Sequence, residues 1–153
     1  LIMLSGLMFI GASPGSCGGG IKTTTFALLC LGLRARLRGW GKARAFRRSI
    51  APAAVDRAMA VFLLSLGTVT AATFALLCLQ PLPPLAAWFE VISAFGTVGL
   101  STGVTPGLAA GGKLLLAAVM FAGRLGPLTL AYSMAHPVEA EEMEYAEENV
   151  MVG

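Results

Sequence analysis

Charged residues are scarce in this sequence. Only 12% of its 153 residues are Asp, Glu, Lys or Arg, whereas 56% are hydrophobic. A soluble domain carries about 25% charged residues, so roughly half of the usual water-facing groups are missing here. The mean hydropathy of +0.78 points the same way. This shortage argues against a water-soluble globule and for a protein whose solvent is lipid.

Cysteine and histidine are also too few for the sites they usually build. Cys17, Cys30 and Cys78 are dispersed, with no CxxC pair, and His136 has no ligand cluster around it. This pattern excludes a disulfide framework and a zinc-type site. The sequence begins at Leu1 and lacks the basic segment and cleavage site of a signal peptide. We therefore expect a fragment of a longer protein that lacks the N-terminal part.

A phosphate-binding loop is absent as well. Residues 15–25 resemble the pattern G-x-x-x-x-G-K-[ST], but Ile21 separates Gly20 from Lys22. The segment also follows an apolar run and not a strand that opens a βαβ unit. A P-loop nucleotide-binding protein is thus a disfavoured alternative. We expect no enzyme activity and no organic cofactor.

The few charges are segregated along the chain. Eight of the eleven Lys and Arg residues lie in 34–57, and six of the eight acidic residues lie in 139–148. A basic loop of this length between apolar spans is expected on the cytoplasmic side. There it can contact anionic lipid head groups. Because membrane spans hold the basic loop at both ends, we expect no nucleic-acid partner.

The apolar runs predict an all-α membrane protein. Residues 1–33 form a broken inner helix interrupted by a Gly-rich loop at 11–25, and 58–79 and 114–132 form two further spans. A helix needs about 20 apolar residues to cross a bilayer. A break at membrane depth is tolerated only inside protein or beside a wet cavity. With the basic loop inside, the tail 133–153 is expected to be cytoplasmic too.

The most informative stretch lies between the last two spans. A short helix is predicted at 84–95, followed by a glycine-interrupted segment at 96–103. An extended Thr-Val-Gly backbone after a short helix is how potassium channels present carbonyl oxygens to a dehydrated cation. An ordinary glycine-rich turn is the alternative. The residues predicted to contact the ion are Thr97, Val98, Gly99 and Leu100.

Three charged residues lie near this stretch or within the spans. Arg124 follows Leu114 by ten residues, ~15 Å along a helix, which places it near the bilayer centre and favours a wet interior over snorkelling. Pro127 comes soon after and predicts a kink. Lys22 either lies in the pore loop or reaches the cytoplasmic boundary. Glu90 either accepts hydrogen bonds from filter amides, pairs with a cation elsewhere, or faces the outer vestibule.

Four motifs resemble those of one family. Residues 11–25 look like the intramembrane gating loop of bacterial TrkH/KtrB potassium transporters, and 89–103 look like their fourth filter segment. Residues 120–130 resemble their last inner helix, and 145–153 resemble the short C-terminus of the KtrB branch. The sequence thus resembles the TrkH/KtrB/HKT superfamily, closest to KtrB. Cys17 departs from the pattern, which has threonine there.

The resemblance implies a membrane helix–pore loop–membrane helix repeat, present four times around one pore. This chain would hold the last helix of the third repeat and, in 58–132, the fourth. It implies K+ as the transported ion, with Na+ as a second candidate, in the inner (plasma) membrane of a bacterium. It also implies a homodimer and a cytoplasmic nucleotide-binding (RCK-type) regulatory ring. A non-transporting membrane scaffold is the alternative.

The resemblance further assigns roles to individual residues. Gly99 would be the filter glycine, Glu90 a supporting residue, and Arg124 would stabilise the closed gate. The residues assigned to gating are Gly11, Ser13, Gly15, Ser16, Gly18, Gly19, Gly20, Lys22 and Arg124.

Overall fold

The computed structural model describes residues 1–16, 18–39, 44–45 and 48–126. The elements of these residues follow in the order α1 (Ile2–Phe9), α2 (Thr23–Leu37), β1 (Arg44–Ala45), β2 (Arg48–Ser49), α3 (Pro52–Leu79), α4 (Pro84–Phe95), η1 (Thr105–Gly107) and α5 (Ala110–Leu125). The described part is mostly helical, as predicted. The exception is the short antiparallel pair β1–β2 in the basic segment.

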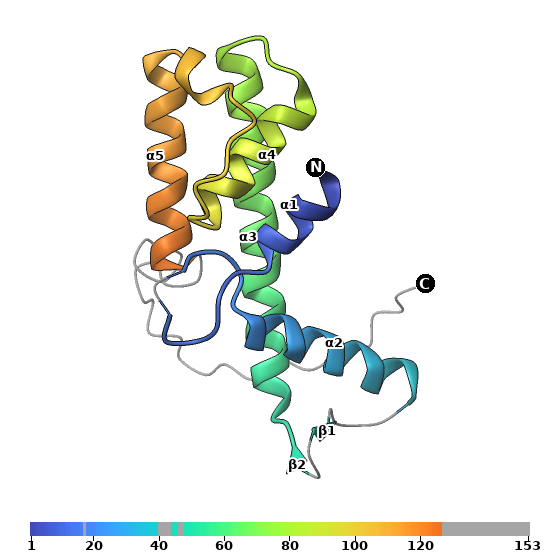
Figure 1. Cartoon of the computed structure of the whole chain (residues 1–153). Coiled ribbons are helices and arrows are strands. Elements are labelled where there is room, and N and C mark those ends of the chain that lie inside the picture. Colours follow the sequence, from blue (N-terminus) through green and yellow to red (C-terminus); the bar gives the residue numbers. More distant parts are fainter. Residues whose placement is uncertain (17, 40–43, 46–47, 127–153) are drawn as a thin grey trace, which may run out of the picture.

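The long helix α3 is the frame of the structure (Figure 1). In Figure 1, α5 stands beside its upper part, α4 packs against both, and α2 crosses its lower part. Helix α1 packs against α4. Helix α3 begins at Pro52, six residues before the predicted start at 58. Proline suits the first turn of a helix because its φ is already helical and its missing N–H has no partner there. The basic segment is correspondingly shorter than predicted.

Two other predicted boundaries are wrong. Helix α2 begins at Thr23 and runs to Leu37, so the loop before it is shorter than 11–25 and the helix extends beyond 33. Helix α5 spans Ala110–Leu125 and ends at Gly126, whose φ of 87° and ψ of 133° leave the helical region. A residue before proline is pushed away from the α conformation. Within the described residues the predicted helix 114–132 ends at Leu125, and 127–132 and the tail 133–153 lie outside them.

Helix α4 forms the centre of the core. All of its residues from Phe89 to Phe95 are buried, and it packs against α1, α3 and α5. The buried partners on the neighbouring helices are Met8, Val69, Ala72, Leu76, Leu116 and Val119. Its bounds, Pro84–Phe95, match the predicted short helix, with Pro83 and Pro84 at the start and Gly96 at the end. The core therefore fixes the position of the loop that follows α4.

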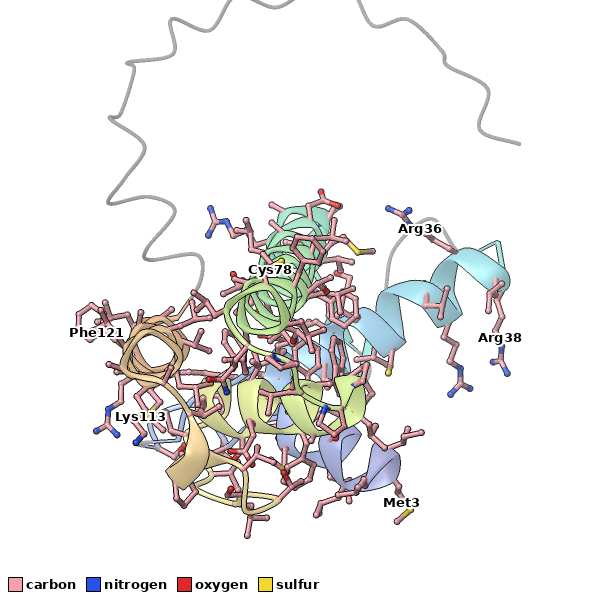
Figure 2. All side chains as sticks on the ribbon, turned by 90° about the horizontal axis from the view of Figure 1, so that it is seen from above. Met3, Arg36, Arg38, Cys78, Lys113 and Phe121 are labelled. Atoms are coloured by element: carbon pink, nitrogen blue, oxygen red, sulfur yellow. The ribbon has the colours of Figure 1, made fainter. Side chains whose placement is uncertain are left out.

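The outside of the structure is unusually apolar. Among the described residues, α3 is the one helix long and apolar enough to cross a membrane, and α4 is a shorter apolar helix. Large apolar side chains such as Ile2, Met3, Phe74 and Leu114 are at least 70% exposed. Figure 2 shows Met3 and Phe121 pointing outward from different helices. Such a surface is suited to contact with lipid or with further protein.

Candidate functional site

The backbone after α4 turns back onto the end of the helix. The amide of Gly96 donates to the carbonyl of Ile92 (2.8 Å), that of Thr97 to Ala94 (3.0 Å) and that of Val98 to Ser93 (3.0 Å). These hydrogen bonds satisfy the carbonyls of Ile92, Ser93 and Ala94 near the end of the helix. Within the described residues, the carbonyl oxygens of 97–99 accept no hydrogen bond.

The segment is not uniformly extended, which corrects the prediction of an extended Thr-Val-Gly backbone. Thr97 has a φ of 52° and is the one non-glycine residue among those described with positive φ, and Gly99 has a φ of 82°. A β-branched residue in this region is strained by roughly 1–3 kcal/mol and persists only where its surroundings hold it. Thr97 is half-buried, whereas Val98 and Leu100 are 44% and 46% exposed. The side chains of Val98 and Leu100 are thus exposed, whereas that of Thr97 is partly covered.

Glu90 holds the far end of this segment. Its side chain is 4% exposed. One carboxylate oxygen, Oε1, accepts hydrogen bonds from Ser101 Oγ (2.7 Å), from the Thr102 amide (2.7 Å) and from Thr102 Oγ1 (3.0 Å). Thr105 Oγ1 donates to the other oxygen, Oε2, at 2.6 Å. Of the three alternatives for Glu90, the structure shows the first, because the amide of Thr102, within the predicted filter segment 96–103, donates to its carboxylate.

A cavity lies beside the loop that Glu90 holds. A hollow of about 410 Å³ lies between α4, α5 and the loop, with Glu90, Gly99 and Ser101 in one wall and Leu116 and Met120 in the other. The loop therefore does not pack tightly on α5 there. Its position depends on polar contacts to Glu90. Sequence reasoning missed this cluster of hydroxyls, although the only acidic residue between 57 and 138 is a signal for it.

The loop between α1 and α2 is closed at its base by backbone hydrogen bonds. The amide of Gly11 donates to the carbonyl of Ile21 (2.7 Å), and the amide of Ile21 donates to Phe9 (3.1 Å). Ile21 is only 2% exposed and anchors the base. A turn follows, in which Ser16 donates to the carbonyl of Ser13 from both its amide and its hydroxyl. The loop is thus a defined structure that projects from its base.

The far side of this loop contacts the predicted filter segment at Thr97. The amide of Gly19 donates to Thr97 Oγ1 at 2.8 Å, across 78 positions of sequence. A Cβ atom at Gly19 would lie 2.7 Å from the carbonyl oxygen of Phe95, and a Cβ atom at Gly123 of α5 would collide with the same oxygen. Figure 1 shows the loop passing below the end of α4. Two glycines from distant segments, Gly19 and Gly123, therefore both approach the carbonyl of Phe95, the last residue of α4.

The remaining predicted gating residues are distributed around the loop. Gly11 and Gly20 face each other at its base, and Gly18 packs on Ala12. Exposed positions in the turn are occupied by Ser13, Gly15 and Ser16.

The two cations of the predicted gate, Lys22 and Arg124, are both exposed. Lys22 is exposed and occupies the N-cap position of α2 without a side-chain hydrogen bond to the helix. Arg124 is exposed in the last turn of α5, and its place near the bilayer centre stays a prediction. Arg124 makes no hydrogen bond or ion pair to other described residues. Its role in the gate stays a prediction.

Metal ligation by acidic, cysteine or histidine side chains has no support in the described part of the chain. No group of three such residues comes together there. The hydroxyl groups that come together there, those of Ser101, Thr102 and Thr105, donate hydrogen bonds to the carboxylate of Glu90.

The chain is similar to curated cation transporters over nearly its whole length. It is 40% identical over 160 residues to the potassium/sodium uptake protein NtpJ of Enterococcus hirae. It is 43% identical over 147 residues to the Ktr system potassium uptake protein B of Bacillus subtilis, and 41% over 153 residues to the Ktr system potassium uptake protein D of that organism. These alignments cover 96–100% of the chain but only 33–35% of each relative. The chain thus spans about a third of the length of these relatives.

The family comparison agrees with these relatives. The TrkH family, described as cation transport protein, matches residues 1–144. With this match and relatives at 40% identity or above, the chain belongs to the TrkH family of cation transport proteins.

Proposed function

We propose that this chain is part of the membrane subunit of a bacterial potassium uptake system. In this proposal residues 97–100 form one wall of a four-part selectivity filter, and the loop between α1 and α2 is a gate below it. K+ passes down its electrochemical gradient, with Na+ as a second candidate. The observation that carries the proposal is the Gly19–Thr97 hydrogen bond, because it joins the loop to the filter segment.

The membrane arrangement follows from helix length and charge. Helix α3 has the length and composition of a span. The basic segment is cytoplasmic by the positive-inside rule, so α3 runs outward and α4 re-enters from outside. The C-terminal end of α4 then directs its negative dipole end toward a cation at 97–99. We further propose that the full protein is a homodimer regulated by a cytoplasmic nucleotide-binding ring.

The first prediction tests the filter through Gly99. Its φ of 82° makes a side chain there strained, although a Cβ atom would meet no other atom within 4 Å. A left-handed non-glycine residue costs roughly 1–2 kcal/mol. If that cost falls on the K+ site, Gly99→Ser in the full-length protein lowers the K+/Na+ flux ratio roughly fivefold or more. Vesicle flux measurements give this ratio, and Gly107→Ser, in open space outside the filter, is the control.

An unchanged flux ratio in Gly99→Ser would contradict the filter. Absence of K+ uptake by the unmodified protein in transport-deficient cells would contradict the proposed function as a whole and support a scaffold.

The second prediction tests the gate. Deleting Gly18 to Gly20 removes the amide that bonds Thr97 and shortens the loop. We expect faster K+ uptake because the obstruction below the filter is lost. Initial uptake rates in cells are normalised to the amount of protein in the membrane. A deletion of equal length at 40–42 in the basic segment controls for general damage, and slower uptake in a correctly inserted protein would count against a gate.

A further inference from the structure

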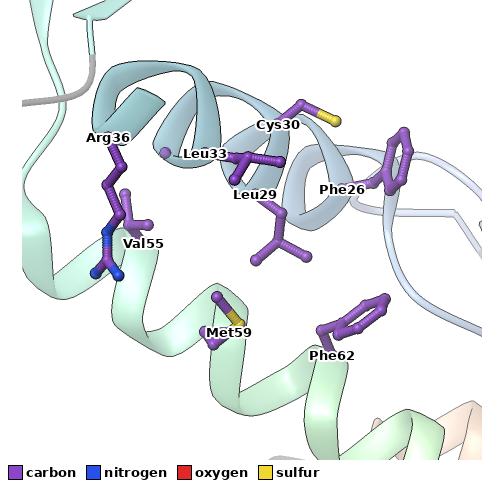
Figure 3. Close-up of a pocket in the computed structure, with 9 residues that line it drawn as sticks. Phe26, Leu29, Cys30, Leu33, Arg36, Val55, Met59 and Phe62 are labelled. Carbon is purple, nitrogen blue, oxygen red and sulfur yellow. The ribbon is translucent and has the colours of Figure 1, made fainter. Parts of the chain in front are cut away.

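An apolar slot lies between α2 and α3, away from the filter and the gate. Its volume is about 320 Å³. Figure 3 shows α2 on one side and α3 on the other, with the side chain of Arg36 at one end of the slot. The apolar residues that line it include Phe26, Leu29 and Leu33 of α2 and Met59 and Phe62 of α3.

The slot exists because the two helices cross closely at one point and diverge beyond it. A Cβ atom at Gly32 would lie 2.7 Å from Cγ1 of Val55, so glycine is what permits this approach. Beyond the crossing, the side chains do not fill the space between the helices. Leu33 is 61% exposed, Met59 43% and Phe26 40%. The slot is therefore open to its surroundings along one side.

The ends of the slot differ in chemistry and in depth. Arg36 lies near Val55, close to the start of α3 at the basic segment. Phe62 lies two turns further along α3, ~10 Å deeper into the bilayer at 1.5 Å per residue. Arg36 has no acidic partner among the described residues. In the proposed orientation, Arg36 thus lies at the inner interface, at one end of the apolar slot. The rest of the slot extends toward the bilayer interior.

We propose that this slot binds one anionic phospholipid of the inner leaflet. The guanidinium of Arg36 holds the phosphate, and an acyl chain lies between Leu29, Leu33, Met59 and the ring of Phe62. Guanidinium groups form paired hydrogen bonds with phosphate oxygens. The inner leaflet is rich in anionic lipid, and basic segments beside a membrane helix attract it. The proposal rests on the orientation given above but not on the filter or on transport.

The charge at Arg36 is tested by native mass spectrometry of the full-length protein. Delipidated protein is titrated with phosphatidylglycerol or with phosphatidylcholine of the same acyl chains. We expect one phosphatidylglycerol to be retained in preference to phosphatidylcholine, and Arg36→Gln to lower that retention roughly tenfold because a charge-assisted contact is lost.

Arg34→Gln is the matched control, since Arg34 is exposed on the same helix but does not line the slot. Arg34→Gln should lower the retention of phosphatidylglycerol by less than about fivefold, which is the general effect of removing one surface charge. Equal losses in both variants, or full retention in Arg36→Gln, would overturn the proposal.

The acyl position is tested separately by filling the slot. Met59→Trp should abolish the preference for phosphatidylglycerol, whereas Leu63→Trp, one turn further on α3 and outside the slot, should keep it. Cys30 lines the slot and is exposed, so its alkylation reports occupancy. Phosphatidylglycerol should slow that alkylation. If Cys30 were not alkylated even in delipidated protein, another protein segment would fill the slot, and the lipid proposal would fail.

Discussion

Gly123→Ala is expected to separate α5 from α4 and to destabilise the protein by about 3 kcal/mol or more, at the upper end of what overpacking causes. A Cβ atom at this position would overlap the carbonyl oxygen of Phe95, and it would also lie 2.8 Å from the Phe95 carbonyl carbon. The obstacle is backbone, which cannot rotate away as a side chain could. Phe95 is itself fully buried, so α4 has little room to retreat.

Helix association inside a membrane makes this contact especially important. Lipid tails are as apolar as the helix surfaces, so close van der Waals packing between small residues supplies much of the stabilisation. The measurement is thermal unfolding of the full-length protein in detergent, together with K+ uptake in cells. We expect a clear drop in unfolding temperature and loss of uptake.

Two other glycines provide matched controls for the change to alanine. Gly67 in α3 has no atom within 4 Å of the added Cβ, and Gly111 in α5 would meet only the Leu79 methyl groups at ordinary contact distance. Both substitutions should be neutral or stabilising, because alanine favours helix by about 1 kcal/mol over glycine. If Gly123→Ala unfolded at the same temperature as Gly111→Ala, the close approach of α5 to α4 would be wrong.

Glu90→Gln should loosen residues 101–105 and destabilise the protein by roughly 2–4 kcal/mol, since hydrogen bonds to a charged group are worth ~1.5–3 kcal/mol each and part of them persists with an amide. The amide nitrogen of glutamine is a donor where the structure needs an acceptor. One of the hydroxyl or amide donors from Ser101, Thr102 and Thr105 then loses its partner. Amide hydrogen exchange of residues 101–105 should increase.

A double-mutant cycle separates this contact from general damage. Thr105 Oγ1 lies 2.6 Å from Glu90 Oε2, so Glu90→Gln and Thr105→Val should be non-additive by about 1 kcal/mol or more. Thr70 donates to Leu66 within its own helix and is exposed, so Thr70→Val combined with Glu90→Gln should be additive. Additivity in the Glu90–Thr105 pair would mean that the carboxylate does not hold the loop.

Local signals in the sequence were sufficient to predict some of the elements. The helix Pro84–Phe95 begins at two prolines and ends at a glycine, and each of these acts within one turn. The early start of α3 was missed because Asp56 and Arg57 suggest a loop, although a helix can continue past the bilayer into water. The end of α5 was signalled by Gly126-Pro127, which was interpreted as a kink.

Contacts between distant segments could not be predicted in the same way. The Gly19–Thr97 hydrogen bond joins two glycine-rich segments, and their spacing carries no information about which amide meets which hydroxyl. The left-handed backbone of Thr97 contradicts its intrinsic preference and is imposed by its surroundings. The hydroxyl partners of Glu90 likewise depend on how the loop folds over α4. These features required the packed structure.

The burial of α4 has a consequence for the order of events during synthesis. Its twelve residues are too short for an independent span, and the carbonyls of Ile92, Ser93 and Ala94 are satisfied by the backbone that follows it. The helix also packs against α5, which is synthesised later. We therefore expect Pro84 to Leu125 to insert as one unit, and a nascent chain arrested before Ala110 to leave α4 without one of the helices that bury it.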